Sequence, residues 1–228
     1  MNITGSIALV TGANRGLGKA YVEALLSAEA AKVYAAARDV TTIKDHPRVV
    51  PIRLDVTSGS DIAEAAARCG DVNLLINNAG AMLSSPILAE HSDLAMRKEM
   101  EVNVYSVLAM IRAFSPVLAK NGGGAIVNVL SVVSWFTVSA NATYCASKHA
   151  ALSVTDAVRM ALKAQSTQVV GVYAGFIDTE MAAGINQPKT PPQQVAERTI
   201  EGIVSGQDHV LADARAEEVF KAVRGERP

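Results

Sequence analysis

The sequence predicts one α/β domain in which a mostly parallel sheet is covered by helices on both faces. Strand-like and helix-like segments alternate almost throughout the 228 residues, which is typical of repeated strand–helix–strand units. Half of the residues are hydrophobic but only 4% are aromatic, so aliphatic side chains supply the bulk, as strands buried on both faces require. A chain of this length can bury one large core.

Seven segments are expected as strands because they are short apolar runs rich in β-branched residues. They are residues 6–10, 32–37, 49–54, 72–76, 125–129, 169–173 and a short segment near Val210. Helical spacing predicts helices at 16–28, 61–68, 94–119, 144–163 and near 192–205. Right-handed crossovers would place a ligand at the carboxyl ends of the strands, near the point where the strand order reverses.

Composition argues against several classes of protein. The net charge is −1 and basic residues do not cluster, so neither a nucleic acid nor a membrane is an expected partner. Cys69 and Cys145 are too few for a disulfide framework, and the four histidines lack ligand spacing, so no metal site is expected. The longest uncharged stretch, 121–146, is interrupted by polar residues, and the start lacks the pattern of a signal peptide. We therefore expect a soluble, cytoplasmic protein.

A glycine-rich loop follows the first strand and reads Thr11-Gly12-Ala13-Asn14-Arg15-Gly16-Leu17-Gly18. Glycines here let the backbone turn tightly and approach a pyrophosphate, whose charge the N-terminus of the following helix stabilises. A plain strand–helix turn is the alternative, since the spacing differs from Gly-x-Gly-x-x-Gly.

The Thr-Gly-x-x-x-Gly-x-Gly spacing resembles the short-chain dehydrogenase/reductase family, and further motifs follow in that family's order across residues 6–181. They are Asp55-Val56, Asn77-Asn78-Ala79-Gly80, Asn103, Ser131, Tyr144-Cys145-Ala146-Ser147-Lys148, and Gly175, Ile177 and Thr179. The resemblance implies a Rossmann-type, seven-stranded fold, with residues 1–228 forming a single NAD(P)-binding domain. It also implies a nicotinamide cofactor and hydride transfer between a ketone or aldehyde and its alcohol.

The resemblance assigns roles to four residues. Tyr144 is expected to be the general acid in reduction and the base in oxidation, and Lys148 to tune it and bind the nicotinamide ribose. Ser131 would orient the substrate oxygen, and Asn103 would hold a water in the proton path. The residues expected to bind cofactor are Gly12, Asn14, Arg15, Gly16, Leu17, Gly18, Arg38, Asp55, Val56, Asn78, Ala79, Gly80, Gly175, Ile177 and Thr179, with Tyr144 and Lys148.

Physical chemistry explains the pairing of a tyrosine with a lysine. A free tyrosine has a pKa of about 10, which is high for acid/base catalysis near neutral pH. Tyr144 and Lys148 lie four residues apart, hence on one face of the predicted helix. An ammonium about 5 Å from a phenolate contributes roughly 3 kcal/mol at an effective dielectric near 20, or about two pKa units. The sequence therefore predicts a lowered pKa for Tyr144.

The end of the second strand bears on the choice of nicotinamide. Family members that prefer NAD carry an acidic residue there, whereas this sequence has Ala37 followed by Arg38, and Arg15 lies in the glycine loop. Two guanidinium groups would form charge-assisted bonds with a 2′-phosphate. NADP(H) is therefore favoured over NAD(H). The alternative is that Arg38 pairs with Asp39 and Arg15 is simply solvated.

The sequence departs from the family pattern around the expected substrate pocket. Ala174 stands where a proline usually precedes Gly175, and the segment between residues 180 and 192, the expected substrate lid, is brief. A short lid implies an open pocket. The expected apolar lining is Val133, Trp135, Phe136, Phe176 and Met181.

Two other functions remain as alternatives. A non-catalytic NADP(H)-binding redox sensor would be expected to lack the Tyr or the Lys, and both are present. Epimerisation or dehydration of a nucleotide sugar would need a larger C-terminal region than the residues after Met181 supply. By the resemblance we expect a homodimer or homotetramer packed through the two long helices. The substrate, the stereochemistry and the preferred direction are not predicted.

Overall fold

The computed structural model describes residues 1–223 and 225, which form one sheet of seven parallel strands. The order across the sheet is β3-β2-β1-β4-β5-β6-β7. The strands are β1 (Ile7–Thr11), β2 (Lys32–Ala37), β3 (Val49–Arg53), β4 (Leu74–Asn77), β5 (Gly124–Val129), β6 (Thr167–Tyr173) and β7 (His209–Leu211). This confirms the predicted Rossmann-type, doubly wound fold, in which every strand pair is parallel.

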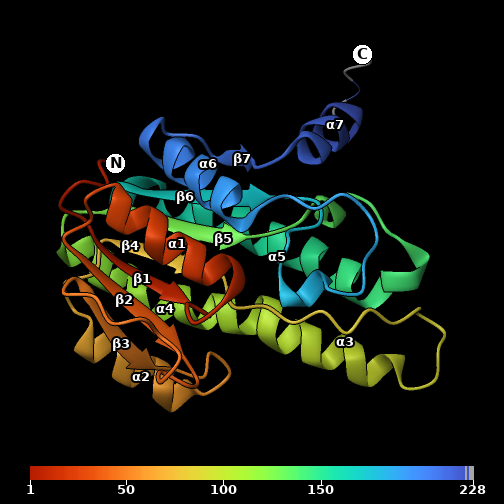
Figure 1. Cartoon of the computed structure of the whole chain (residues 1–228), viewed down its shortest axis with the longest axis horizontal. Coiled ribbons are helices and arrows are strands. Elements are labelled where there is room, and N and C mark those ends of the chain that lie inside the picture. The colour runs from red at the N-terminus through yellow and green to blue at the C-terminus, as the bar shows by residue number, and fades with distance from the viewer. Residues whose placement is uncertain (224, 226–228) are drawn as a thin grey trace.

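A layer of helices covers each face of the sheet (Figure 1). The first layer consists of α1 (Gly16–Ser27) and α6 (Pro192–Val204), and the second of α2 (Gly59–Arg68), α4 (Ser106–Lys120) and α5 (Ala142–Leu162). Successive side chains of a strand point to opposite faces. In β1, Ala8 and Val10 accordingly join the core under the first layer, and Leu9 joins the core under the second.

Two helical features differ from the sequence prediction. The helix expected at 94–119 consists of α3 (Ser92–Met100), a π-helical turn (Glu101–Tyr105) and α4. A further helix, α7 (Ala214–Val223), follows β7, where the sequence pattern indicated none. The short connection between β2 and β3 contains no helix.

The helical run 92–120 is, within the described residues, the one segment long and apolar enough to cross a membrane by length and composition. Its apolar side chains include Met110, Phe114 and Leu118, which are buried in the core between the sheet and α2. This packing accounts for its apolar character as that of a helix covering a sheet.

The strand order reverses between β1 and β4, because the chain builds β2 and β3 on one side of β1 and the later strands on the other. The loops that leave the carboxyl ends of these two strands therefore diverge to opposite faces of the sheet. In open α/β sheets, ligands bind in the crevice between two loops that diverge in this way. The predicted site residues follow the carboxyl ends of β1 to β6 or lie on helices beside them.

At the opposite ends of the strands, their amino ends, the backbone of β5 lies very close to the residue that precedes β4. Gly124, the first residue of β5, has a φ of +145°, and a Cβ atom there would lie 1.9 Å from the carbonyl oxygen of Asn73. Both observations exclude a side chain without movement of β4 or β5. Gly59, at the start of α2, has nothing within 4 Å of an added Cβ.

Replacing Gly124 by alanine is expected to destabilise the protein by about 2 kcal/mol or more, because of the steric overlap and the disfavoured φ. The midpoint of thermal unfolding should fall by about 4–8 °C for a chain of this size. Gly59→Ala is the matched control and should leave the midpoint unchanged or raise it slightly. Equal midpoints for the two variants would contradict the close approach of β4 and β5.

Candidate active site

The glycine loop closes on itself between β1 and α1. Gly12 and Gly16 have φ angles of +64° and +50°, and a Cβ on Gly18 would lie 2.0 Å from the carbonyl oxygen of Gly12. Arg15 is the N-cap residue of α1 but forms no side-chain cap, and the first turn holds no acidic residue. The N–H groups at this helix start are therefore free of a competing side chain. Such a helix start stabilises an anion, so the loop fits the pyrophosphate of a dinucleotide.

A network around Thr11 and Asn78 holds this loop against β4. The hydroxyl of Thr11 accepts the N–H groups of Asn78 and Ala79, each at 3.0 Å. The side-chain amide of Asn78 donates to the carbonyl oxygens of Thr11, at 2.8 Å, and of Gly12, at 3.3 Å. The sequence motifs included both residues but did not predict this mutual bonding, which fixes the glycine loop to the end of β4.

Asn103 lies in the π-helical turn and ties two segments together. Its amide donates to the carbonyl oxygen of Ala81 at 2.8 Å and to the hydroxyl of Ser147 at 2.9 Å. Its carbonyl oxygen accepts the N–H of Ala81 at 2.9 Å. Because Ser147 lies on α5 between Tyr144 and Lys148, Asn103 connects the loop after β4 to the helix that carries the expected acid/base pair.

Ser131 lies two residues after the end of β5 and caps a short 3₁₀ turn, Val132–Ser134, with its hydroxyl accepting the N–H of Val133 at 3.3 Å. Lys148 is 6% exposed, and its ammonium donates to the carbonyl oxygen of Val129, the last residue of β5, at 2.9 Å. The same ammonium lies 5.6 Å from the centroid of the Tyr144 ring. Asn103, Ser131, Tyr144 and Lys148 are thus brought to the carboxyl ends of β4 and β5.

The pKa of the Tyr144 phenol is raised above its usual value, mainly by burial and then by the charge of Glu99 and the nearby Cys145, while a hydrogen bond with Ser131 lowers it. The lowered pKa expected from the sequence is therefore wrong for the protein itself. Burial also lowers the pKa of Lys148 to about 8. The sequence argument considered only the attraction between the two side chains, whereas desolvation disfavours the charged form of each.

The two candidate arginines differ in their surroundings. Arg15 pairs with Glu180, at the start of the expected lid. Arg38 is exposed and forms no ion pair among residues 1–223 and 225. Asp39 accepts the N–H and hydroxyl of Thr41 instead, at 3.0 and 2.7 Å. Arg38 is therefore available to a ligand, whereas Arg15 would have to share its charge with Glu180.

Asp55 follows β3, and the half-buried Val56 packs on the core under α2 and α4. One carboxylate oxygen of Asp55 accepts the N–H of Thr57 at 2.9 Å and its hydroxyl at 2.7 Å, and these bonds lower the pKa of the carboxyl group. Within residues 1–223 and 225 the second oxygen forms no hydrogen bond, so it can accept one from a ligand. Asn14 reaches across to Thr42 at 3.3 Å, which joins the glycine loop to the segment after β2.

Asp213, which the sequence analysis did not single out, anchors the segment after β6. This buried carboxylate accepts the N–H of Gly175 at 2.8 Å, the hydroxyl of Thr190 at 3.1 Å and the N–H of Ala216 at 2.8 Å. Ile177 pairs with Thr190 as an isolated bridge. The sequence could have pointed to Asp213 because it closely follows the last predicted strand, and residues at that position lie at the carboxyl ends of the strands with the other candidate site residues.

The segment from Gly175 to Thr179 reaches the glycine loop. A Cβ on Gly16 would lie 3.1 Å from the Thr179 methyl group, so these two loops are in near contact. Gly80 likewise lies beside Asn103, whose oxygen would be 3.4 Å from a Cβ at that position. The glycine loop after β1 and the segment after β6, which both carry expected cofactor residues, therefore lie side by side.

The residues expected to line the substrate pocket lie in different environments. Trp135 stacks on Tyr173 with 4.0 Å between ring centroids, and Phe220 of α7 lies 5.3 Å away. Val133 and Phe136 pack partly buried against the same cluster. Phe176 is half-buried and Met181 is 49% exposed on the segment after β6. The stacking commits much of the Trp135 ring to α7 and β6.

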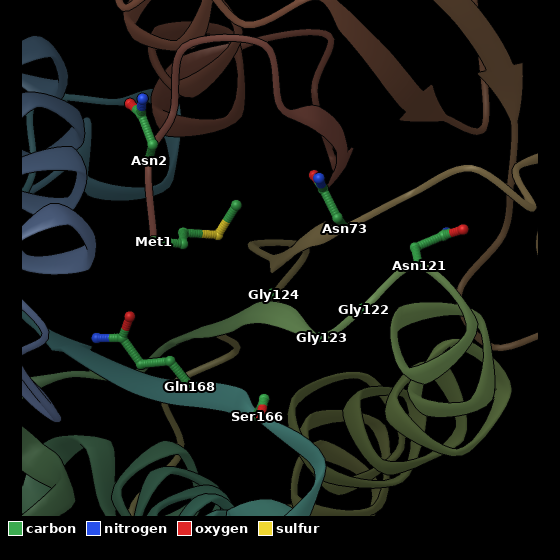
Figure 2. A pocket seen from close by; sticks show the side chains of 9 residues that line it. All are labelled: Met1, Asn2, Asn73, Asn121, Gly122, Gly123, Gly124, Ser166 and Gln168. Atoms are coloured by element: carbon green, nitrogen blue, oxygen red, sulfur yellow. The ribbon is translucent and has the colours of Figure 1, made fainter.

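A separate cavity of about 420 Å³ lies at the amino ends of the strands, and its lining includes none of the predicted site residues (Figure 2). Two of its polar side chains already have structural partners. Asn73 accepts the N–H of Ile7 at 2.9 Å, and Asn121 donates to the carbonyl oxygens of Gly70 and Val72 at 3.1 and 3.0 Å. In the described part of the chain no group of three or more His, Cys, Asp or Glu side chains could hold a metal ion.

Comparison with known proteins finds similarity to short chain dehydrogenases and related oxidoreductases. A family model described as short chain dehydrogenase matches residues 6–190. An uncharacterized oxidoreductase of Staphylococcus aureus is 30% identical over 213 residues, which cover 87% of this chain and 90% of that protein. A short chain dehydrogenase from Monascus purpureus is 30% identical over 198 residues, 79% of this chain and 68% of that protein.

Solved structures agree with these relatives. The crystal structure of a short chain dehydrogenase from Burkholderia cenocepacia in complex with NADP is 42% identical to this chain. It superimposes with a TM-score of 0.95, covering all of this chain and 96% of that one. A short chain dehydrogenase/reductase from Burkholderia phymatum in complex with NAD has a TM-score of 0.86 at 23% identity, covering 98% of this chain and 93% of that one, which shows the shared fold.

The buried ammonium of Lys148 predicts a specific dependence of stability on pH. Its pKa of about 8 in the folded protein lies below the value of about 10.4 in an unfolded chain. Between these values the unfolded chain holds more protons, so the free energy of unfolding gains from Lys148 as the pH rises. Lys148→Met should be about 1–3 kcal/mol more stable than the natural chain at pH 7, since it removes the desolvated charge.

The stability advantage of Lys148→Met over the natural chain should shrink by up to about 1.4 kcal/mol per pH unit between about pH 8 and 10.4. Urea denaturation of both proteins across that range measures it. Lys163→Met, which removes an exposed lysine at the end of the same helix, should not show the effect. Parallel stability profiles for Lys148→Met and the natural chain would contradict a depressed pKa for Lys148.

Proposed function

The chain belongs to the short-chain dehydrogenase/reductase family of oxidoreductases, and we propose that it interconverts a ketone or aldehyde and its alcohol with NADP(H). The observation that carries this proposal is the meeting of Asn103, Ser131, Tyr144 and Lys148 beside a glycine loop that fits a dinucleotide. A site with a proton donor, a hydroxyl donor and a cofactor crevice suits the reversible reduction of a carbonyl group.

The bound nicotinamide would supply or accept the hydride. The chain's own groups handle the charge and the proton on the substrate oxygen. Ser131 would donate a hydrogen bond to the carbonyl oxygen, which becomes negative during reduction, and the Tyr144 phenol would transfer its proton there. With its raised pKa the Tyr144 phenol holds this proton at neutral pH, so the proton is present for transfer to the substrate oxygen.

Lys148 would act on both the phenol and the cofactor. Its ammonium holds one bond, to the carbonyl oxygen of Val129, and has further donors for the ribose hydroxyl groups. A positively charged nicotinamide and the ammonium would together oppose the effect of burial on the Tyr144 pKa, and so make the phenol a usable base in alcohol oxidation.

NADP(H) is supported as the preferred cofactor by two observations. Ala37 ends β2 with no carboxylate for a ribose diol, and the exposed Arg38 follows it without an ion-pair partner in the described chain. The Burkholderia cenocepacia protein, which is 42% identical, was crystallised with NADP. Arg38 is therefore assigned to the 2′-phosphate. Arg15 would bind the same phosphate only when its ion pair with Glu180 is broken.

We also propose a domain organisation, a location and an assembly for the chain. Residues 1–228 would act as one NAD(P)-binding domain in the cytoplasm, with the segment near 180–192 as a short lid over a small-molecule substrate. A homodimer or homotetramer would pack through α4 and α5. Two exposed side chains lie there: Tyr105, which directly precedes α4, and Met160 of α5.

Tyr144→Phe is expected to lower turnover of carbonyl substrates by at least about 100-fold, because the proton donor is lost, while NADPH binding is retained. Absorbance loss of NADPH with a panel of aromatic and aliphatic carbonyls measures turnover, and fluorescence titration measures binding. Tyr105→Phe, at an exposed position, is the matched control. Tight NADPH binding without turnover by the natural chain on any carbonyl would favour a redox sensor instead.

Arg38→Ala is expected to raise the Kd for NADPH by about 10- to 100-fold, since a charge-assisted bond to the 2′-phosphate is lost. The Kd for NADH should change little, because NADH lacks that phosphate. Arg53→Ala is the control, since Arg53 is an exposed arginine at the end of the neighbouring strand that pairs with Asp61. Equal losses for NADPH and NADH would remove Arg38 from the 2′-phosphate site.

A further inference from the structure

Glu99 is a fully buried carboxylate on α3 that the proposed reaction does not use. One of its oxygens accepts the N–H groups of Leu83, at 2.7 Å, and Ser84, at 3.1 Å. The other oxygen is buried and forms no hydrogen bond within the described residues. A buried carboxylate with one unpaired oxygen is costly for the fold, so its place beside the candidate active site calls for an explanation.

The loop of residues 81–85 is held at three points, and Glu99 supplies the middle one. Asn103 binds both backbone groups of Ala81. Thr143 and Ser85 exchange two bonds: the N–H of Ser85 donates to the Thr143 hydroxyl, and the N–H of Thr143 donates to the Ser85 carbonyl oxygen, each at 3.2 Å. Thr143 directly precedes Tyr144, so the position of this loop is transmitted to the start of α5.

The middle of the loop needs such support. Ser84 has a φ of +58°, a left-handed conformation that favours glycine, and its buried hydroxyl has no partner in the described chain. The two N–H groups that Glu99 accepts come from this residue and its neighbour. The carboxylate therefore holds the loop in a conformation that the local sequence disfavours.

We propose that Glu99 is a positioning residue for Tyr144, which fixes the 81–85 loop against the start of α5 and sets a negative charge beside the phenol. The inference rests on the proposed function, because it assigns Glu99 a part in proton transfer through Tyr144. Glu99 itself touches neither substrate nor cofactor in this assignment.

The charge of Glu99 acts in a definite direction. The groups that influence the phenol are Lys148 and Cys145 on α5, Ser131 after β5, and Glu99 on α3. His149, the other titratable group of this part of α5, points its ring to the carbonyl oxygen of Cys145. Among these groups Glu99 is the one carboxylate, and it opposes loss of the phenolic proton. Its charge therefore extends the protonated form of Tyr144, from which carbonyl reduction starts, to higher pH.

Glu99→Gln tests the charge, because the glutamine carbonyl can still accept the N–H groups of Leu83 and Ser84. The pH dependence of kcat should be measured in both directions, with saturating NADPH or NADP and the best carbonyl–alcohol pair from the panel. The rising limb for oxidation and the falling limb for reduction should both move to lower pH, by about 0.5–1 unit for the loss of one nearby charge. KM should stay within about twofold of the natural value.

Glu101→Gln is the matched control, since Glu101 is exposed and lies two residues further along the same helical run. Its two limbs should superimpose on those of the natural chain. A purely structural role for Glu99 would lower both rates without moving either limb. The charge assignment is overturned if the Glu99→Gln limbs do not move, or if Glu101→Gln moves them equally.

Hydrogen exchange tests the loop independently of activity. In Glu99→Ala, the 81–85 peptide should exchange its amide hydrogens at least about tenfold faster than in the natural chain, whereas Glu99→Gln should retain the protection. Unchanged exchange in Glu99→Ala overturns the positioning role. If the natural chain reduces no carbonyl, the proposed function fails, and these exchange rates still decide whether Glu99 holds the loop.

Discussion

The site depends above all on the burial of one ammonium group. Lys148 is 6% exposed, and its ammonium donates to the carbonyl oxygen of Val129 at the end of β5. Moving an ammonium out of water is unfavourable unless its donors are satisfied. Helix α5 must therefore lie close enough to the end of β5 for this bond to form, and that approach brings Tyr144, one turn earlier, beside Ser131.

A line of buried polar side chains keeps α5 in this register. Asn77 at the end of β4 donates to Asn128 of β5 at 2.9 Å, and Asn128 donates to Thr155 of α5 at 3.0 Å. Each bond lies in the protein interior, where a lost partner costs more than the bond itself contributes. Two strands and the helix are thus joined about two turns beyond Lys148, so sliding α5 would break several bonds at once. Proton transfer needs such fixed geometry.

The sequence predicted the strands, and it named most of the residues that the structure brings together at the candidate site, because both depend on short-range patterns. Apolar runs and glycine or asparagine motifs stand at strand ends, where both the fold and the crevice need them. The π-helical turn at Asn103 was not predictable, since one widened turn leaves the apolar spacing on either side intact. Helix α7 was missed because only Ala216 and Val219 of its residues are buried, too few for a clear periodic signal.

Asp213 and Glu99 show a different limit of sequence reasoning. Asp213 accepts a backbone N–H 38 residues away and Glu99 one that is 16 residues away, and every residue type except proline supplies such a group. The pKa of Tyr144 shows the same limit: the attraction of Lys148 follows from spacing, whereas burial and Glu99 depend on the tertiary fold. The roles of these carboxylates could be inferred only once the chain segments had been brought together.

The segment after β6 is bound at both of its ends, and this joins the proposed cofactor and substrate sites. Asp213 holds Gly175 and Thr190, and Arg15 of the glycine loop pairs with Glu180. The Arg15 pair is exposed on both sides, so it contributes little stability and can exchange partners readily. A dinucleotide phosphate near Arg15 would compete with Glu180 for the guanidinium. Filling the proposed cofactor site would then loosen one attachment of the proposed lid while Asp213 keeps the other, so the weak Arg15–Glu180 pair would couple the lid to the cofactor.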